Sequence, residues 1–114
     1  MGVPGQGGET RRQGEGAKSF HDVLRRSVQE GIAATVGRDV ATAVEFYVDS
    51  SLAVKDVAAY AAALQRLFAD GSKVIEERCA RALYSNLGLD FEPVSGFRLD
   101  DYVEAARNAR RERR

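Results

Sequence analysis

Apolar residues recur every three to four positions between residues 19 and 106, the spacing that places them on one face of an α-helix. Each recurring stretch is bounded by the polar caps, glycines or prolines at which helices begin and end. The pattern predicts an all-α fold, a compact bundle of about five helices joined by short loops that favour antiparallel neighbours. The expected helices span roughly residues 19–36, 39–50, 56–69, 72–87 and 100–113.

The first expected helix has a clear start and end. Ser19 stands at the N-cap position with Asp22 three residues on, and Gly37 stands where a left-handed C-terminal cap belongs. Gly31 lies inside the helix, where glycine costs up to about 1 kcal/mol relative to alanine. We therefore expect another helix to pass close to Gly31.

The second expected helix starts with Asp39 as its N-cap. Its VEFYV run favours a strand on propensity alone, but the cap and the helical spacing of the apolar positions outweigh that preference. Those positions are Val40, Ala43, Val44, Tyr47 and Val48. Residues 50–56 are expected to form a short connection from which Leu52 and Val54 reach the core.

Asp56 is the expected cap of the third helix, and Gly71 separates that helix from the fourth. Asp70 or Ser72 is expected to cap the fourth helix. Its buried stripe should consist of Ile75, Cys79, Ala80, Ala82, Leu83 and Leu87, and its solvent-exposed side of Glu76, Glu77, Arg78 and Arg81.

The end of the fourth helix and the last helix complete the bundle. Gly88 is expected to stop the fourth helix, with Leu89 folding back on Tyr84. In the following loop, Phe91 and Val94 are expected to fill the core. Asp100 is the expected cap of the last helix, whose apolar positions are Leu99, Tyr102, Val103 and Ala106.

Length and composition fit one small domain. The chain has 114 residues and a mass of 12.4 kDa. It has no apolar run of the roughly 20 residues that span a bilayer, no secretory signal and only one cysteine. We therefore expect a cytoplasmic protein without a membrane partner. Glycine-rich residues 1–18 are expected to be a disordered head, followed by a helical domain over residues 19–106 and a basic helix end over residues 107–114.

The formal net charge of zero hides an uneven distribution. Residues 107–114 hold five arginines against one glutamate, a net charge of +4, whereas residues 19–106 carry a net charge of −5. Arginine runs can contact phosphates, so the candidate nucleic-acid contacts are Arg107, Arg110, Arg111, Arg113 and Arg114. The acidic body and the lack of a helix with a basic face argue against a helix-turn-helix protein. The preference for arginine over lysine suits a thermophile, although a GC-rich genome gives the same bias.

No arrangement of residues typical of catalysis is apparent. Cys79 lies on an apolar helix face, where a thiol behaves as a small hydrophobic side chain, and His21 lies in a first helical turn, where the dipole disfavours its charged form. The carboxylate pairs at 76–77 and 100–101 diverge by about 100° on a helix and do not aim at one substrate. Metal-ligand spacing and phosphate-binding glycine loops are absent from the sequence. We expect no enzyme activity, no cofactor, no metal and no small-molecule substrate.

The stretch LQRLFADGSKVIEERCARALYSNLGLDFE resembles a small all-helical archaeal domain of unknown function, in which a phenylalanine, a glycine and a lysine precede a hydrophobic helix that ends in Leu-Gly-Leu. The matching residues are Phe68, Gly71, Lys73, Ile75, Leu83, Leu87 and Gly88. The resemblance covers at most residues 19–92. It implies an archaeal source and a stand-alone or appended regulatory module, but no activity.

Apolar stripes this wide on a small domain are expected to leave apolar surface exposed. We expect that surface around Phe46, Tyr47 and Tyr102, where homodimerisation would cover it. The expected function is a non-enzymatic protein-interaction or regulatory module that self-associates or serves as a small subunit of an assembly. The alternative is a nucleic-acid-associated protein that uses its arginine-rich C-terminus for phosphate contacts. An enzyme would need a convergent polar cluster between the helices, which the sequence does not indicate.

Overall fold

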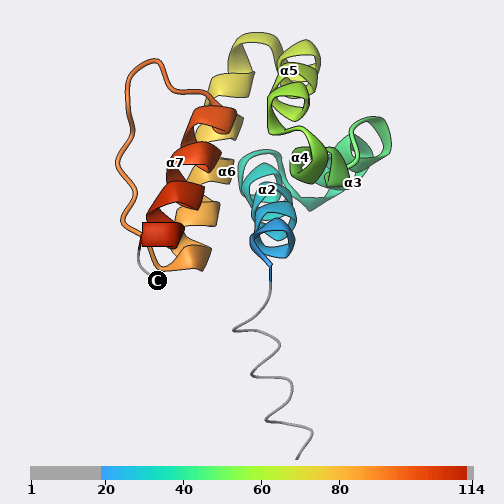
Figure 1. Cartoon of the computed structure of the whole chain (residues 1–114). Helices are drawn as coiled ribbons and strands as arrows, with labels where there is room; N and C mark the ends of the chain where they lie inside the picture. The colour runs from blue at the N-terminus through green and yellow to red at the C-terminus, as the bar shows by residue number, and fades with distance from the viewer. Residues whose placement is uncertain (1–18, 113–114) are drawn as a thin grey trace, which may run out of the picture.

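The structure is a computed structural model that describes residues 19–112, with side chains as far as residue 110. This part of the chain is helical and contains no strand, as the spacing of apolar residues predicts (Figure 1). Its α-helices are α2 (Phe20–Val36), α3 (Arg38–Tyr47), α4 (Ser51–Lys55), α5 (Val57–Phe68), α6 (Ser72–Leu87) and α7 (Leu99–Glu112). The expected head, residues 1–18, and the last two arginines, Arg113 and Arg114, lie outside the described residues.

Helices α2 and α6 form the most extensive helix pair of the fold. Gly31 of α2 meets Cys79 of α6, and Ser27 of α2 meets Asn86 further along α6, so the two helices are antiparallel. A Cβ atom on Gly31 would stand 2.5 Å from the Cys79 Cα and 2.6 Å from its backbone nitrogen. The expected close approach of another helix at Gly31 is therefore confirmed.

The hydrophobic core lies where α2, α5, α6 and α7 meet. Its members that are fully buried include residues from all four helices, in agreement with the apolar stripes of the sequence. The largest are Leu24, Val28, Tyr60, Leu64, Leu83, Leu99 and Val103.

Several helix ends follow the sequence. The Ser19 hydroxyl accepts a hydrogen bond from the Asp22 backbone nitrogen at 3.1 Å, and the Asp56 carboxylate accepts one from the Ala59 nitrogen at 3.0 Å. At the end of α6, Gly88 adopts a left-handed conformation with φ of 73°, as expected. The Leu89 nitrogen then donates to the Tyr84 carbonyl at 2.8 Å, which is the expected Schellman ending.

Other helix ends differ from expectation. The N-cap of α3 is Gly37 rather than Asp39, and Gly37 has φ of 93° with an extended ψ of 160° instead of a left-handed helical conformation. The connection expected over residues 50–56 contains the short helix α4, in which Ala53 is the buried residue. A 3₁₀ turn, Ala69–Gly71, leads into α6, and no side chain caps that helix.

The start of α7 is also one residue earlier than expected. The helix begins at Leu99, so Asp100 lies inside its first turn. The carboxylate that caps the end is that of Asp101, which accepts a hydrogen bond from the Arg98 backbone nitrogen at 2.9 Å. The sequence offered two adjacent aspartates, and spacing alone did not distinguish them.

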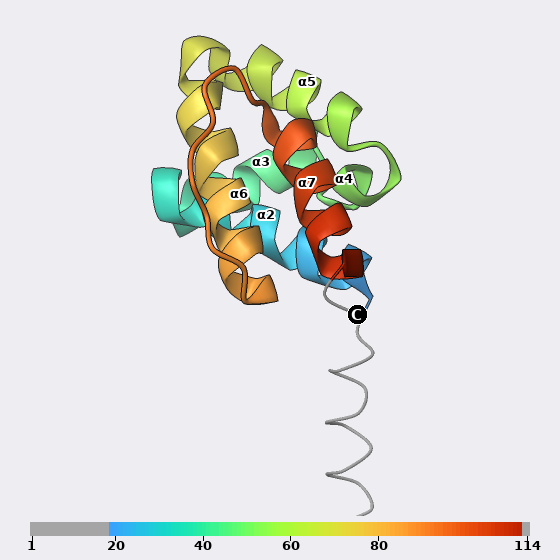
Figure 2. The same ribbon diagram turned by 60° about the vertical axis from the view of Figure 1, so that its left-hand side comes forward.

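Helices α6 and α7 run parallel, not antiparallel. Glu76 of α6 contacts Leu99 of α7, and Tyr84 further along α6 contacts Tyr102 further along α7. The long connection between Leu87 and Leu99 makes this possible, because it returns along the outside of the bundle to the level where α6 starts (Figure 2). Within this connection Phe91 packs against the core as expected, whereas Val94 is 44% exposed and does not.

Candidate interaction surface

Helix α3 is apolar on two sides, and the described chain covers only one of them. Val44 on the covered side is 6% exposed, and Val48, which follows the helix, is 8% exposed. On the other side Phe46 is 87% exposed and Tyr47 is 78% exposed. We call this uncovered side the α3 face, and it consists of Val40, Ala43, Phe46 and Tyr47.

The α3 face corrects part of the sequence interpretation. The stripe expected to point inward is split, because Val44 and Val48 are buried while Val40, Ala43 and Tyr47 are not. Helix α3 packs chiefly against α2, since the positive φ of Gly37 lets the chain turn sharply at the end of α2. It lies on the side of the molecule away from α7 (Figure 1). The expected exposure of Phe46 and Tyr47 matches the structure.

A buried serine anchors the C-terminal end of α3. Ser50 is 0% exposed, and its hydroxyl accepts hydrogen bonds from Arg25 Nε at 3.0 Å and Gln29 Nε2 at 2.9 Å, both on α2. The hydroxyl and the backbone nitrogen of Ser50 both donate to Glu45 Oε2 at 2.9 Å. The exposed aromatic side chains therefore project from a fixed helix. Nothing in the sequence distinguishes Ser50 from the adjacent Ser51 for this role.

An open hollow of about 440 Å³ adjoins the α3 face. It lies between the C-terminal end of α3 and helices α4 and α5. Its apolar lining consists of Tyr47, Val48, Leu52, Ala63 and Leu67, and two charged residues, Asp49 and Arg66, also line it. Leu67 is 43% exposed, so the apolar surface continues from α3 onto α5.

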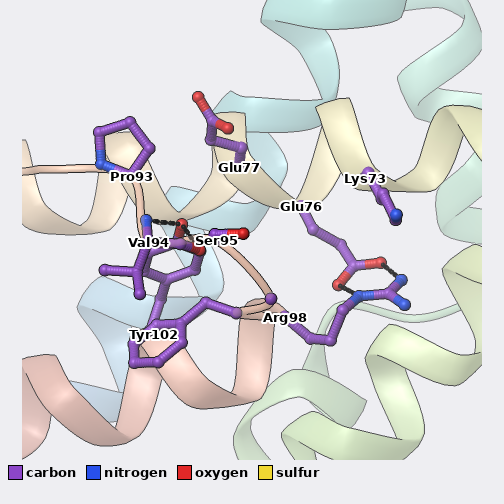
Figure 3. A pocket seen from close by; sticks show the side chains of 10 residues that line it. Lys73, Glu76, Glu77, Pro93, Val94, Ser95, Arg98 and Tyr102 are labelled. Atoms are coloured by element: carbon purple, nitrogen blue, oxygen red, sulfur yellow. Dashed lines mark hydrogen bonds and ion pairs between the residues drawn. The ribbon is translucent and has the colours of Figure 1, made fainter.

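Tyr102 does not belong to this surface. It is 5% exposed and lies at the centre of an aromatic cluster with Tyr84, Phe91 and Phe97, with ring centroids 5.1 to 6.4 Å from its own. Its hydroxyl accepts a hydrogen bond from the Val94 nitrogen at 2.9 Å (Figure 3). The expectation that Tyr102 is exposed is wrong, because the returning connection covers the helix face on which it lies.

A second hollow, of about 470 Å³, lies between α6 and the end of this connection. Figure 3 shows that Glu76 and Arg98 face each other at one side of it, while Lys73 extends beside them. The loop over residues 93–97, together with Glu77 and Tyr102, forms its remaining lining. The charges of Glu76 and Arg98 thus bind each other and are not directed into the open space.

Glu76 is the clearest error of the sequence interpretation. It was expected on the exposed side of its helix, but it is 2% exposed. Its carboxylate accepts hydrogen bonds from Arg98 Nε and from the Leu99 backbone nitrogen, both at 3.0 Å, and forms an ion pair with the terminal nitrogen of Arg98. This hydrogen bonding raises the pKa of Arg98 above its ordinary value. The pair therefore fixes the start of α7 against α6.

Arg98 also links this pair to α5. Its guanidinium donates to the Ser72 hydroxyl at 3.3 Å. With the Gln65 amide turned so that its oxygen faces the guanidinium, Gln65 accepts a hydrogen bond from Arg98 at 2.7 Å. The arginine thus joins three helices, which indicates a structural role and not a free ligand contact.

The C-terminal arginines are the nucleic-acid contacts expected from the sequence. The structure places the guanidinium groups of Arg107 and Arg110 over the ring of Phe20, 5.0 and 5.9 Å from its centroid, and Arg107 forms an ion pair with Glu104 at 3.5 Å. These two cations are held against α2. Arg111 lies in α7 beyond the last described side chain, and Arg113 and Arg114 lie outside the described residues.

Cys79 has the properties of a packed thiol. It is 0% exposed, its Sγ donates a weak hydrogen bond to the Val28 carbonyl at 3.5 Å, and burial raises its pKa to about 12. A reactive cysteine needs the opposite shift and partial exposure. His21 is exposed at the start of α2.

Within residues 19–112, no group of three or more histidine, cysteine or acidic residues is arranged to hold a metal ion. None of the helices in that range combines the length and the apolar character that crossing a bilayer requires. Comparison with family models, curated proteins and solved structures finds no match to this chain. The functional inference therefore rests on the geometry of the α3 face.

Proposed function

We propose that this protein is a non-enzymatic protein-interaction module, either regulatory or a small subunit of an assembly, and that the α3 face is its docking surface. The observation that carries the proposal is the pair of adjacent aromatic residues, Phe46 and Tyr47, exposed by 87% and 78% on an anchored helix. Aromatic side chains are enriched at protein interfaces, and tyrosine is among the residues that most often carry the binding energy.

The surroundings of the α3 face support this role. Burying one large aromatic ring removes about 150–250 Å² from water, so two exposed rings are a substantial unfavourable exposure for an isolated molecule. The Ser50 hydrogen bonds hold α3 in place, so docking would not require this helix to be ordered first. The adjoining hollow continues the apolar surface onto α5.

Nucleic-acid binding has less support than docking of a protein. Two of the five candidate arginines, Arg107 and Arg110, are already stacked on Phe20. Catalysis has less support as well, because the second hollow is bordered by an ion pair whose two charges bind each other.

Photo-crosslinking inside the cells that express the protein tests the proposal. Phe46 is replaced by the photoreactive p-benzoylphenylalanine, and the matched control carries the same residue at Val74, which is 53% exposed on α6. We expect protein adducts, either with the same chain or with another protein, from position 46 and not from position 74. An absence of adducts at position 46, or equal adducts at both positions, would show that the α3 face is not a docking surface.

A further inference from the structure

We propose that the α3 face binds the α3 face of a second copy of the chain, with the two helices antiparallel about a two-fold axis close to Ala43. This inference rests on the proposed docking function of the α3 face and specifies its partner. In such an isologous contact, each residue pair across the axis occurs twice. The α3 face therefore has to be complementary to itself.

The apolar residues of α3 meet this requirement. An antiparallel pair centred near Ala43 places Val40 of one copy against Tyr47 of the other, because the two residues lie nearly equal distances on either side of the centre along the helix. Ala43 itself has the smallest side chain of the α3 face, and small residues at a crossing point let two helix backbones approach closely. Phe46 of each copy then packs beside the axis.

Arg38 and Asp49, at the two ends of α3, form a self-complementary pair of charges, with exposed Asp39 next to Arg38. Arg38 at the N-terminal end is exposed and forms no ion pair within the described part of the chain. Asp49, just beyond the C-terminal end, has a 64% exposed side chain that reaches Arg25 only at 3.9 Å. Antiparallel pairing brings Arg38 of one copy close to Asp49 of the other, twice.

Asp49 remains available as an anion for this contact. The Ser51 backbone nitrogen donates to its carboxylate at 2.8 Å, and this hydrogen bond lowers the pKa of Asp49 below its ordinary value. The positive end of the α3 dipole of the second copy lies at the same place and favours a negative charge there. Arg38 and Asp49 thus attract each other in the antiparallel arrangement, whereas the parallel arrangement places each beside its own copy.

The available area fits a modest, reversible dimer. The two aromatic rings of each copy can bury roughly 300 Å² or more, and Val40, Leu67 and the polar rim extend the contact towards the roughly 800 Å² per partner of a standard interface. Because few residues form the contact, loss of one ring should measurably weaken the dimer. Phe46 is almost fully exposed, so its replacement leaves the core unchanged.

The first experiment measures the mass of the purified full chain by sedimentation equilibrium from low to high micromolar concentration. We expect a concentration-dependent dimer whose dissociation constant rises at least about tenfold in Phe46→Ser and in Tyr47→Ser and stays unchanged in the control Val74→Ser. A wild-type chain that stays monomeric throughout, or a dimer that persists in both α3 variants, overturns the inference. Circular dichroism confirms that each variant is folded.

The second experiment tests the antiparallel arrangement. Arg38→Glu and Asp49→Lys should each weaken the dimer when measured alone. A mixture of the two variants should recover it, because one contact of the mixed dimer then pairs the two reversed charges and the other keeps the original pair of Arg38 and Asp49. No recovery in the mixture means that these ends do not meet.

Disulfide trapping locates the axis. Ala43→Cys should form a disulfide-linked dimer on mild oxidation, whereas the exposed control Ala105→Cys on α7 should not, and buried Cys79 does not interfere. Equal trapping at both positions refutes the assigned axis. If the purified chain is monomeric but position 46 still crosslinks to a different protein in cells, the docking function stands and only the identity of the partner is wrong.

Discussion

Replacing Gly31 by alanine is the sharpest test of the contact between α2 and α6. In an open helix this change stabilises by about 1 kcal/mol, because alanine has the better helix propensity. Here the added Cβ would stand 2.5 Å from Cys79 Cα, 2.6 Å from Cys79 N and 2.9 Å from the Arg78 carbonyl carbon. All three are backbone atoms, so no side chain can rotate away, and the two helices must separate.

The expected result is a net destabilisation. Overpacking of a core typically costs about 1–3 kcal/mol, and occasionally more, and a backbone clash belongs at the upper end of that range. After the gain in propensity we expect the free energy of unfolding to fall by about 2 kcal/mol or more. For a domain of this size, that corresponds to a melting temperature lowered by about 8–16 °C.

Urea unfolding followed by circular dichroism measures this change, and two further variants make it interpretable. Ala34→Gly, at an exposed position on α2, reports the effect of propensity alone and should cost about 1 kcal/mol. Cys79→Ala combined with Gly31→Ala should not restore stability, because the clash involves the backbone of residue 79 and not its sulfur. If Gly31→Ala stabilises the protein, or if the double variant rescues it, the inferred backbone contact is wrong.

Three further predictions concern buried polar groups. Tyr60→Phe should stabilise the protein by about 1 kcal/mol in urea unfolding, because the Tyr60 hydroxyl is buried and has no hydrogen-bond partner in the described structure. A loss of stability would indicate a partner for that hydroxyl. Arg98→Met should lower the free energy of unfolding by about 3–5 kcal/mol, since it leaves the Glu76 carboxylate buried without a cation. Glu76→Gln should lower it less, because the Arg98 side chain is 31% exposed and can be solvated. A larger loss in Glu76→Gln than in Arg98→Met would contradict this account. Burial raises the pKa of Cys79 from 9.0 to about 12, so the buried thiol contributes fully to the free energy of unfolding below pH 9. Between pH 9 and pH 12 the free energy of unfolding should fall by up to about 1.4 kcal/mol per pH unit. Cys79→Ala should reduce this slope, and an unchanged slope would exclude the thiol as its cause.

Periodicity predicted most helices because each buries a single apolar stripe against the others. In α2 the capping residue, the stripe and the glycine end all indicate the same boundaries, and in α6 the stripe and the glycine end do. The sequence also identified Gly31 as a contact point, since a glycine inside a helix requires a reason. The environment of Cys79 followed from the same stripe.

Periodicity could not predict which polar residue becomes buried. Glu76 is adjacent to Ile75 on α6, and its burial depends on where α7 begins after a long connection. The parallel course of α7 is not encoded in its own spacing. The network at Ser50 was missed for a similar reason, because it joins residues from two helices and a turn that are distant in sequence.

Helix α3 shows how such an error can be informative. Its apolar positions cover a wider arc than one neighbouring helix can bury, and the described fold provides one main neighbour, α2. A helix that is apolar on two sides needs two partners. Val44 and Val48 find theirs within the chain, whereas Phe46 and Tyr47 do not. The sequence correctly indicated that this helix buries an apolar surface, and the part that the monomer leaves open is the part that a second α3 helix can cover.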